Sequence, residues 1–222
     1  MKQEQEIFDA YHKWYFETER QVQTKWRGIP CLKSVCDLWN YQEIIFEMDA
    51  CIIVEFGTYC GGSTLFFADL FRAMCEPQTA YKHRKILGVD TAMGNITQLA
   101  RESEYIELME CSSSDPKVSN RISEIRQQYP GKMFAILDSL HTRDHVLAEL
   151  ENLRTVTRTG DYVIVEDSNL GGHPVCSEWG DNGPYDAREE YFKHYPNDYI
   201  YDIEREKKFG FTFSTRGFLK RQ

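Results

Sequence analysis

Short apolar runs alternate with amphipathic segments between residues 50 and 165. Helical spacing of apolar positions marks Ser63–Cys75, Asp115–Tyr129 and Arg143–Thr155. The strand-like runs lie between these helical patterns: Cys51–Phe56, Lys85–Val89, Tyr105–Met109, Lys132–Leu137 and Asp161–Val165. Continuous apolar strands separated by helices are typical of a parallel sheet that is covered on both faces. The central part of the chain is therefore predicted to be an α/β domain.

The two ends of the chain depart from this alternation. Residues 1–40 show helical spacing through Ile7, Tyr11 and Trp14, which predicts an N-terminal helical segment ahead of a main domain at 41–222. Near the C-terminus, Tyr199–Glu206 and Phe211–Leu219 are two strand candidates joined by a short turn. We therefore expect a mostly parallel sheet flanked by helices and finished by a C-terminal antiparallel hairpin.

Composition excludes several classes of protein. The chain of 222 residues carries 26 Lys and Arg against 35 Asp and Glu, a formal charge of −9, and has 13 Phe and 13 Tyr. The aromatic content supplies a core and argues against disorder. The acidic balance disfavours nucleic acids and anionic membrane surfaces as partners. No stretch approaches the ~20 apolar residues of a membrane span.

The cysteines and the N-terminus bear on the compartment. Seven cysteines occur without a CxxC pair, and several lie in apolar runs, as expected of reduced thiols that act as small hydrophobic residues. The polar start of the chain lacks the apolar core of a signal peptide. Both observations predict a cytoplasmic protein.

A glycine-rich loop follows the first strand. Gly57 is followed by Gly61, Gly62 and Ser63 at the start of a helix. Glycine allows a close approach of the backbone to a ligand, and a helix N-terminus offers free N–H groups to a carboxylate or phosphate. The alternative is a tight strand-to-helix turn without a ligand. The GxxxGG spacing differs from the GxGxxG of dinucleotide-binding loops, which disfavours a dinucleotide.

Asp90 ends the second strand and is a candidate for binding a ribose. A carboxylate there can accept hydrogen bonds from ribose hydroxyls, although a lone Asp at a strand end is often a helix cap. Together with the glycine loop, Asp90 favours a cofactor that carries a nucleoside. NAD and S-adenosylmethionine both remain open at this point.

Three carboxylates follow two later strands. Asp138 ends one strand, and Glu166 with Asp167 ends the next. If these strands are neighbours, their acids meet at one edge of the sheet, where carboxylate repulsion favours a divalent cation such as Mg²⁺. The alternative is that the acids cap helices or pair with Arg143 and Arg154.

Two histidines lie just beyond Asp138. His141 is a candidate general base near neutral pH, or a surface residue at a helix start. His145 shares a helix face with His141, and the pair with a carboxylate could form a non-haem iron site. The absence of an HxD pattern disfavours iron.

These motifs together resemble the cephalosporin hydroxylase-like methyltransferases, a group that includes metal-dependent sugar O-methyltransferases of macrolide biosynthesis. The resemblance runs from about Trp26 to the C-terminus. It is carried by the segments Trp26–Pro30, Glu55–Ser63, Cys111–Pro116, Asp138–His141 and Glu166–Asp167, with Asp90.

The resemblance implies a Rossmann-like methyltransferase fold that binds S-adenosylmethionine. By this resemblance, Asp90 would hold the ribose and Ser113 would lie at the adenine edge. His141 and Asp138 would be catalytic, with His141 as the general base. The remaining implied residues would surround the methionine part (Glu55, Gly57, Thr58, Tyr59 and Ser63) or bind Mg²⁺ (Asp138, Glu166 and Asp167).

The function hypothesis is Mg²⁺-dependent methyl transfer to a hydroxyl of a small molecule. A vicinal diol, as in a sugar, suits chelation by a metal. The alternatives are an NAD-dependent oxidoreductase, a non-haem iron oxygenase and a non-catalytic binding module on the same fold. The aromatic N-terminal helices also offer a surface for homo-oligomerisation, by analogy alone.

Overall fold

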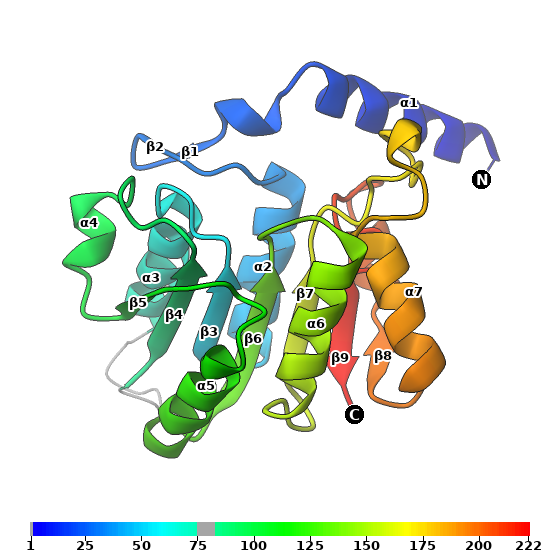
Figure 1. Ribbon diagram of the computed structural model, residues 1–222. Helices are drawn as coiled ribbons and strands as arrows, with labels where there is room; N and C mark the ends of the chain where they lie inside the picture. Colours follow the sequence, from blue (N-terminus) through cyan, green and yellow to red (C-terminus); the bar gives the residue numbers. More distant parts are fainter. Residues whose placement is uncertain (1, 75–82) are drawn as a thin grey trace.

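A seven-stranded sheet forms the centre of the molecule in the computed structural model, which describes residues 2–74 and 83–222 (Figure 1). The strand order is β5-β4-β3-β6-β7-β9-β8. The five strands from β3 to β7 run parallel and match the expected runs closely. Their bounds are β3 Ala50–Phe56, β4 Lys85–Asp90, β5 Ile106–Glu110, β6 Lys132–Leu137 and β7 Tyr162–Val165. The predicted α/β fold with a mostly parallel sheet is confirmed.

Helices cover both faces of the sheet. One apolar layer joins the sheet to α2 Val35–Glu47, α3 Gly62–Met74 and α4 Gln98–Arg101. The opposite layer joins it to α5 Pro116–Gln128, α6 Arg143–Arg154 and α7 Pro184–His194. Cys75, the expected end of the helix that begins at Ser63, lies outside the described residues. Within the described ranges, no helix combines the length and the apolar character needed to cross a membrane.

The C-terminal region forms the expected antiparallel pair, but with much shorter strands. β9 Phe218–Arg221 pairs antiparallel with both β7 and β8 Tyr199–Tyr201. The predicted strand Tyr199–Glu206 is wrong beyond Tyr201, because Asp202 caps a short helix, α8 Ile203–Lys207. The predicted strand Phe211–Leu219 is wrong before Phe218, because the Phe213 N–H donates to the side chain of buried Asp37 and its carbonyl accepts from Asn169 in the loop after β7, so no regular strand ladder forms.

Residues 2–30 lie across the carboxyl ends of the parallel strands (Figure 1). They comprise α1 Lys2–Glu17, a short 3-10 turn η1 at Gln21–Gln23, and a hairpin of β1 Lys25–Trp26 and β2 Ile29–Pro30. The helical pattern predicts α1 but not the hairpin. The expected limit at residue 40 falls inside α2, which belongs to the cover of the sheet.

A buried histidine attaches α1 to the rest of the molecule. His12 is 3% exposed and packs against the rings of Phe211 and Phe213. Its Nε2 accepts a hydrogen bond of 2.9 Å from Nδ2 of Asn169, in the loop after β7. Burial lowers the pKa of His12 to about 4, so the imidazole is neutral at pH 7.

We expect α1 to loosen in mild acid. The folded-state pKa of His12 lies below its ordinary value. The stabilisation of the folded state by the neutral imidazole is therefore complete above about pH 6.5 and is lost as the pH falls toward about 4. Protonation of Nε2 also removes the acceptor for Asn169. Hydrogen exchange of α1 amides should accelerate over this range. His12→Gln keeps an acceptor but cannot be protonated, so the exchange rate of α1 amides should vary less with pH in this variant. A pH dependence of exchange equal to that of the wild type would contradict the role of His12.

Candidate active site

The glycine loop brings the ends of β3 and β6 together. Gly57 has a φ of +86°, and a Cβ at this position would lie 1.8 Å from the carbonyl oxygen of Asp138. Only glycine fits such an approach. The Asp138 N–H donates to the Phe56 carbonyl at 3.0 Å, and the Gly57 N–H donates to the Val89 carbonyl at 2.8 Å. The loop that leads into α3 therefore lies directly against the backbone of Asp138.

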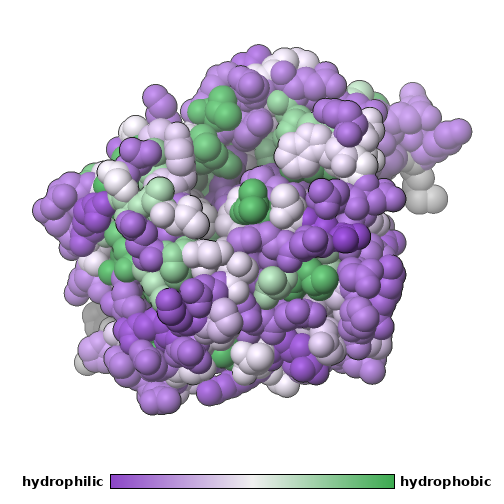
Figure 2. Space-filling model, in the orientation of Figure 1, coloured by the Kyte–Doolittle hydropathy of each residue, from purple (hydrophilic) through white to green (hydrophobic). Residues whose placement is uncertain are grey.

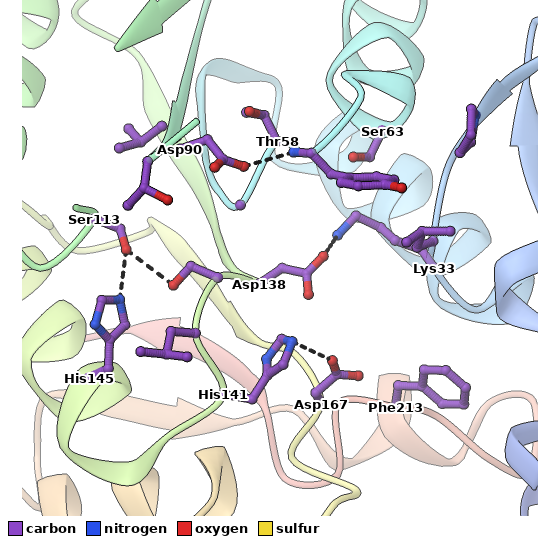
Figure 3. Close-up of a pocket in the computed structure, with 18 of the residues that line it drawn as sticks. Lys33, Thr58, Ser63, Asp90, Ser113, Asp138, His141, His145, Asp167 and Phe213 are labelled. Carbon is purple, nitrogen blue, oxygen red and sulfur yellow. Dashed lines mark hydrogen bonds and ion pairs between the residues drawn. The ribbon is translucent and has the colours of Figure 1, made fainter. Parts of the chain in front are cut away.

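A cavity of about 690 Å³ opens at this edge of the sheet (Figure 3). Most of the residues expected from sequence line it: Gly57, Thr58, Tyr59, Ser63, Asp90, Ser113, Asp138, His141 and Asp167. Glu55 and Glu166 do not line the cavity. Both are buried behind its wall, where they face the same lysine.

Asp90 fixes the glycine loop from the neighbouring strand. Its carboxylate accepts a hydrogen bond of 2.9 Å from the Tyr59 N–H and one of 3.1 Å from the Ala92 N–H. Each carboxylate oxygen has further lone pairs, so Asp90 can still accept from a hydroxyl in the cavity. The structure thus places Asp90 next to the glycine loop, and both line the cavity.

Asp138, His141 and Asp167 form a compact cluster. One potential ligand atom from each lies within 4.8 Å of the other two. His141 Nε2 is 3.1 Å from Asp167 Oδ2, and Asp167 has a φ of +52°, a left-handed conformation that Asp tolerates better than most residues. His145 does not belong to this cluster, because its Nε2 bonds to Ser113 Oγ at 2.9 Å. Among the described residues, the cluster of potential metal ligands therefore contains one histidine and two carboxylates.

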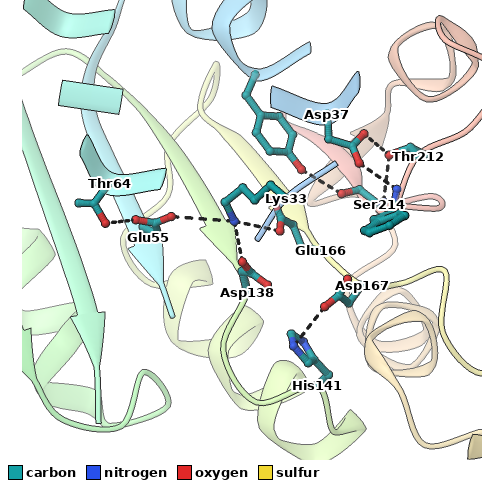
Figure 4. A network of polar contacts seen from close by, with 12 residues as sticks. Lys33, Asp37, Glu55, Thr64, Asp138, His141, Glu166, Asp167, Thr212 and Ser214 are labelled. Carbon is teal, nitrogen blue, oxygen red and sulfur yellow. Dashed lines mark hydrogen bonds and ion pairs between the residues drawn. The ribbon is translucent and has the colours of Figure 1, made fainter. Parts of the chain in front are cut away.

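Lys33 is the residue of this site that sequence reasoning missed. It is 2% exposed, and its Nζ lies 2.6 Å from Asp138 Oδ2, 2.9 Å from Glu166 Oε2 and 3.9 Å from Glu55 Oε1 (Figure 4). No motif signals this role, because Lys33 precedes Asp138 by 105 residues and lies in an irregular segment before α2. Only the fold brings the lysine to the carboxylates.

The single positive charge of Lys33 does not balance the negative charge of the carboxylates around it. Burial, together with the nearby charge of Asp138, raises the pKa of Glu166 to about 7, although Lys33 opposes the shift. Burial also raises the pKa of Asp138 and of Asp167, against the lowering effect of Lys33 or His141. Oε1 of Glu166 is buried and has no hydrogen-bond partner within the described part of the chain. Such a site favours an additional cation.

Several exposed residues that line the cavity are apolar. Val22, Leu32 and Leu140 line it and expose 46%, 41% and 56% of their surface. Figure 2 shows hydrophobic residues between the hydrophilic band of α1 and the body below it. Phe16 from α1 and Phe213 from the loop before β9 complete this side of the cavity. The roof over the acidic cluster is thus built by the N-terminal segment.

Solved structures share the fold of this chain. The chain is similar to "CmcI-N160 apo-structure" with a TM-score of 0.69 and 21% identity, over 90% of this chain and 76% of that one. It is similar to "cmcI-D160 Mg-SAM" with a TM-score of 0.66 and 20% identity, over 90% and 77%. At this level of identity the likeness shows the fold, which is the Rossmann-like methyltransferase fold.

Sequence comparison shows the family. The chain belongs to the family described as Rhamnosyl O-methyltransferase/CmcI, whose model matches residues 18–222. It is 45% identical to rhamnosyl O-methyltransferase of Mycobacterium leprae, over 97% of this chain and 91% of that protein. The identity to the protein of the same name from Mycobacterium tuberculosis is also 45%, over 97% and 85%. The predicted resemblance and the expectation of an O-methyltransferase are confirmed.

We expect Lys33→Met to destabilise the protein strongly. Removing one partner of a buried ion pair leaves uncompensated charge, here on Asp138 and Glu166, and costs about 3–5 kcal/mol. Urea denaturation measures the loss in the free energy of unfolding. Lys117→Met removes a lysine whose side chain is 76% exposed and should change stability little. Equal stability of the two variants would contradict the inference from burial.

Proposed function

We propose that this protein transfers a methyl group from S-adenosylmethionine to a sugar hydroxyl with the help of Mg²⁺. The observation that carries the proposal is the cluster of Asp138, His141 and Asp167 in the cavity of a chain that belongs to an O-methyltransferase family. The M. leprae and M. tuberculosis relatives are named rhamnosyl O-methyltransferases, so rhamnosides are the first acceptors to test. A vicinal diol in the acceptor is our finer proposal.

The cavity fits the methyl donor. Its volume of about 690 Å³ exceeds the lower range of ligand pockets, about 300 Å³. We assign the methionine part to Gly57, Thr58, Tyr59 and Ser63, where the N-terminus of α3 favours a carboxylate. Glu55 is buried behind these residues and supports them through its contacts with Thr64 and Lys33.

The other end of the donor also has candidate partners. We assign Asp90 to the ribose hydroxyls, for which it provides acceptors, and Ser113 to the edge of the adenine. Both residues line the same cavity as the methionine wall. The residues implied by the resemblance thus share one continuous surface, apart from Glu55 and Glu166.

The donor set of the acidic cluster fits Mg²⁺. Carboxylate oxygens are its preferred ligands, and Asp138 and Asp167 offer them at the cavity surface. We include Glu166 as a third ligand because its Oε1 is buried and unpartnered within the described residues. When bound, the metal would supply a Lewis acid that lowers the pKa of the acceptor hydroxyl and orients it.

His141 is our candidate general base. Its Nε2 is 3.1 Å from a carboxylate oxygen of Asp167, so in the neutral ring the Nε2–H donates to Asp167. The Nδ1 atom is then the acceptor for the hydroxyl proton. Asp167 sets the tautomer, and the proximity of Asp138 stabilises the imidazolium after proton transfer.

The environment of the reaction is also part of the proposal. The described cysteines are free thiols, which suits a cytoplasmic location. The charge of −9 disfavours nucleic acids as acceptors, and a membrane is not expected as a partner. Homo-oligomerisation through the N-terminal helices remains a prediction that analytical ultracentrifugation tests.

The proposed activity is tested with a panel of rhamnosides. The protein should convert S-adenosylmethionine to S-adenosylhomocysteine and methylate a rhamnoside hydroxyl when Mg²⁺ is present, as detected by mass spectrometry. A non-catalytic binding module would bind the cofactor without any turnover across the panel.

We expect His141→Ala to separate binding from catalysis. Loss of the general base should lower kcat by about 10²–10⁴-fold. Calorimetry should show that S-adenosylhomocysteine still binds with an affinity close to that of the wild type. The control is His194→Ala, which removes an exposed histidine of α7. Equal losses of turnover and binding would point to a structural role for His141.

We expect Asp167→Asn to weaken the binding of Mg²⁺. The amide keeps the shape of the side chain but removes the negative charge that would bind Mg²⁺. The concentration of Mg²⁺ for half-maximal activity should rise, whereas Asp144→Asn, at a side chain that is 82% exposed, should leave it unchanged. EDTA should abolish the wild-type activity; activity that persists in EDTA would contradict the metal assignment.

A further inference from the structure

A second polar cluster lies at the end of the cavity away from Lys33. It consists of Ser113, Ser139, His145 and Glu149, and three of these residues line the cavity while Glu149 lies behind them. Figure 3 shows Ser113 and His145 on the opposite side of the view from Lys33. The proposed methyl transfer gives no role to His145 or Glu149.

Glu149 is the unusual member of this cluster. It is 0% exposed, and its Oε1 accepts a hydrogen bond of 2.5 Å from Ser139 Oγ and lies 3.3 Å from His145 Nε2. Its Oε2 is buried without a hydrogen-bond partner in residues 2–74 and 83–222. A buried carboxylate with so few partners is costly to keep. Its contacts with two cavity-lining residues suggest that it orients them for a ligand.

The directions of the hydrogen bonds fix the tautomer of His145. An ionised carboxylate only accepts, so the Ser139 hydroxyl donates to Glu149. Ser113 in turn donates to Ser139 at 3.1 Å, which uses the one hydrogen of its hydroxyl. Ser113 must then accept from His145 Nε2, at 2.9 Å. In the neutral ring Nε2 carries the hydrogen, and Nδ1 is the acceptor left for a ligand.

We propose that His145 reads the amino group of the adenine of S-adenosylmethionine, with Ser139 and Glu149 as positioning residues. This inference rests on the proposed function. An acceptor at Nδ1 matches the amino group at position 6 of adenine, which is a donor. A 6-oxo purine presents an acceptor there, and two facing acceptors repel each other. The cluster thus selects for the base, whereas the Asp138 cluster performs the chemistry.

The test compares two ligands whose bases differ at position 6 and, as a consequence, at N1, which is an acceptor in adenine and carries a hydrogen in the 6-oxo purine. Calorimetry gives the Kd of S-adenosylhomocysteine and of S-inosylhomocysteine for each variant. The wild type should prefer the adenine compound by at least about tenfold, the effect of one hydrogen bond replaced by a mismatch. His145→Ala should bring the ratio close to one. His145→Asn, which offers an amide oxygen as acceptor, should recover part of the preference.

A second variant tests the positioning role. Glu149→Gln replaces an acceptor-only group by one that can also donate, so the tautomer of His145 is no longer fixed. The preference for adenine should fall, even where overall affinity stays high. A merely structural role would lower the affinity for both ligands and leave the ratio unchanged. His194→Ala serves as the control and should keep the wild-type ratio.

The outcomes separate this inference from the proposed function. If the wild type binds S-adenosylhomocysteine but His145→Ala and Glu149→Gln both keep the wild-type ratio, the role of His145 is overturned and the proposed function stands. If the wild type binds neither ligand, the proposed function fails and this inference fails with it. If His145→Ala binds neither ligand, Glu149→Gln decides. A ratio of the two Kd values equal to that of the wild type then overturns the inference, and a smaller preference for the adenine compound supports it.

Discussion

The site depends on one buried ammonium group among acids from three strands. Lys33 contacts carboxylates that follow or lie in β3, β6 and β7, and without its charge these acids would repel one another in a region with little water. One positive charge against Glu55, Asp138 and Glu166 leaves a net negative site. The same arrangement therefore holds the strand ends together and creates the demand for a divalent cation at the cavity surface.

Backbone geometry explains why these acids meet. Parallel strands carry their carboxyl ends at one edge, and the order β4-β3-β6-β7 places Asp90, Asp138 and Asp167 along that edge. Gly57 allows the loop after β3 to touch the backbone of Asp138, which a larger residue would prevent. The distances within the site thus follow from sheet topology and from one position without a side chain.

The sequence predicts the parallel sheet because each strand is a continuous apolar run bounded by polar residues. It also predicts the site residues that follow directly after strands, such as Asp90, Asp138 and Asp167. Lys33 escapes prediction because a lysine in an irregular segment looks like any exposed lysine, and its burial is a tertiary effect. The strand predicted through Phe211 fails for a related reason: buried Asp37 binds the Thr212 hydroxyl and the Phe213 N–H, which only the folded chain brings near.

The roof and the floor of the cavity are formed by different parts of the chain. The floor is formed by strand ends and the loops that follow them, whereas α1 and η1 contribute Phe16, Gln21 and Val22 from the start of the chain. Under the proposed function, substitutions in this first segment would alter the roof without disturbing the residues assigned to the sulfonium donor. The roof and the donor wall would then be free to diverge independently during evolution.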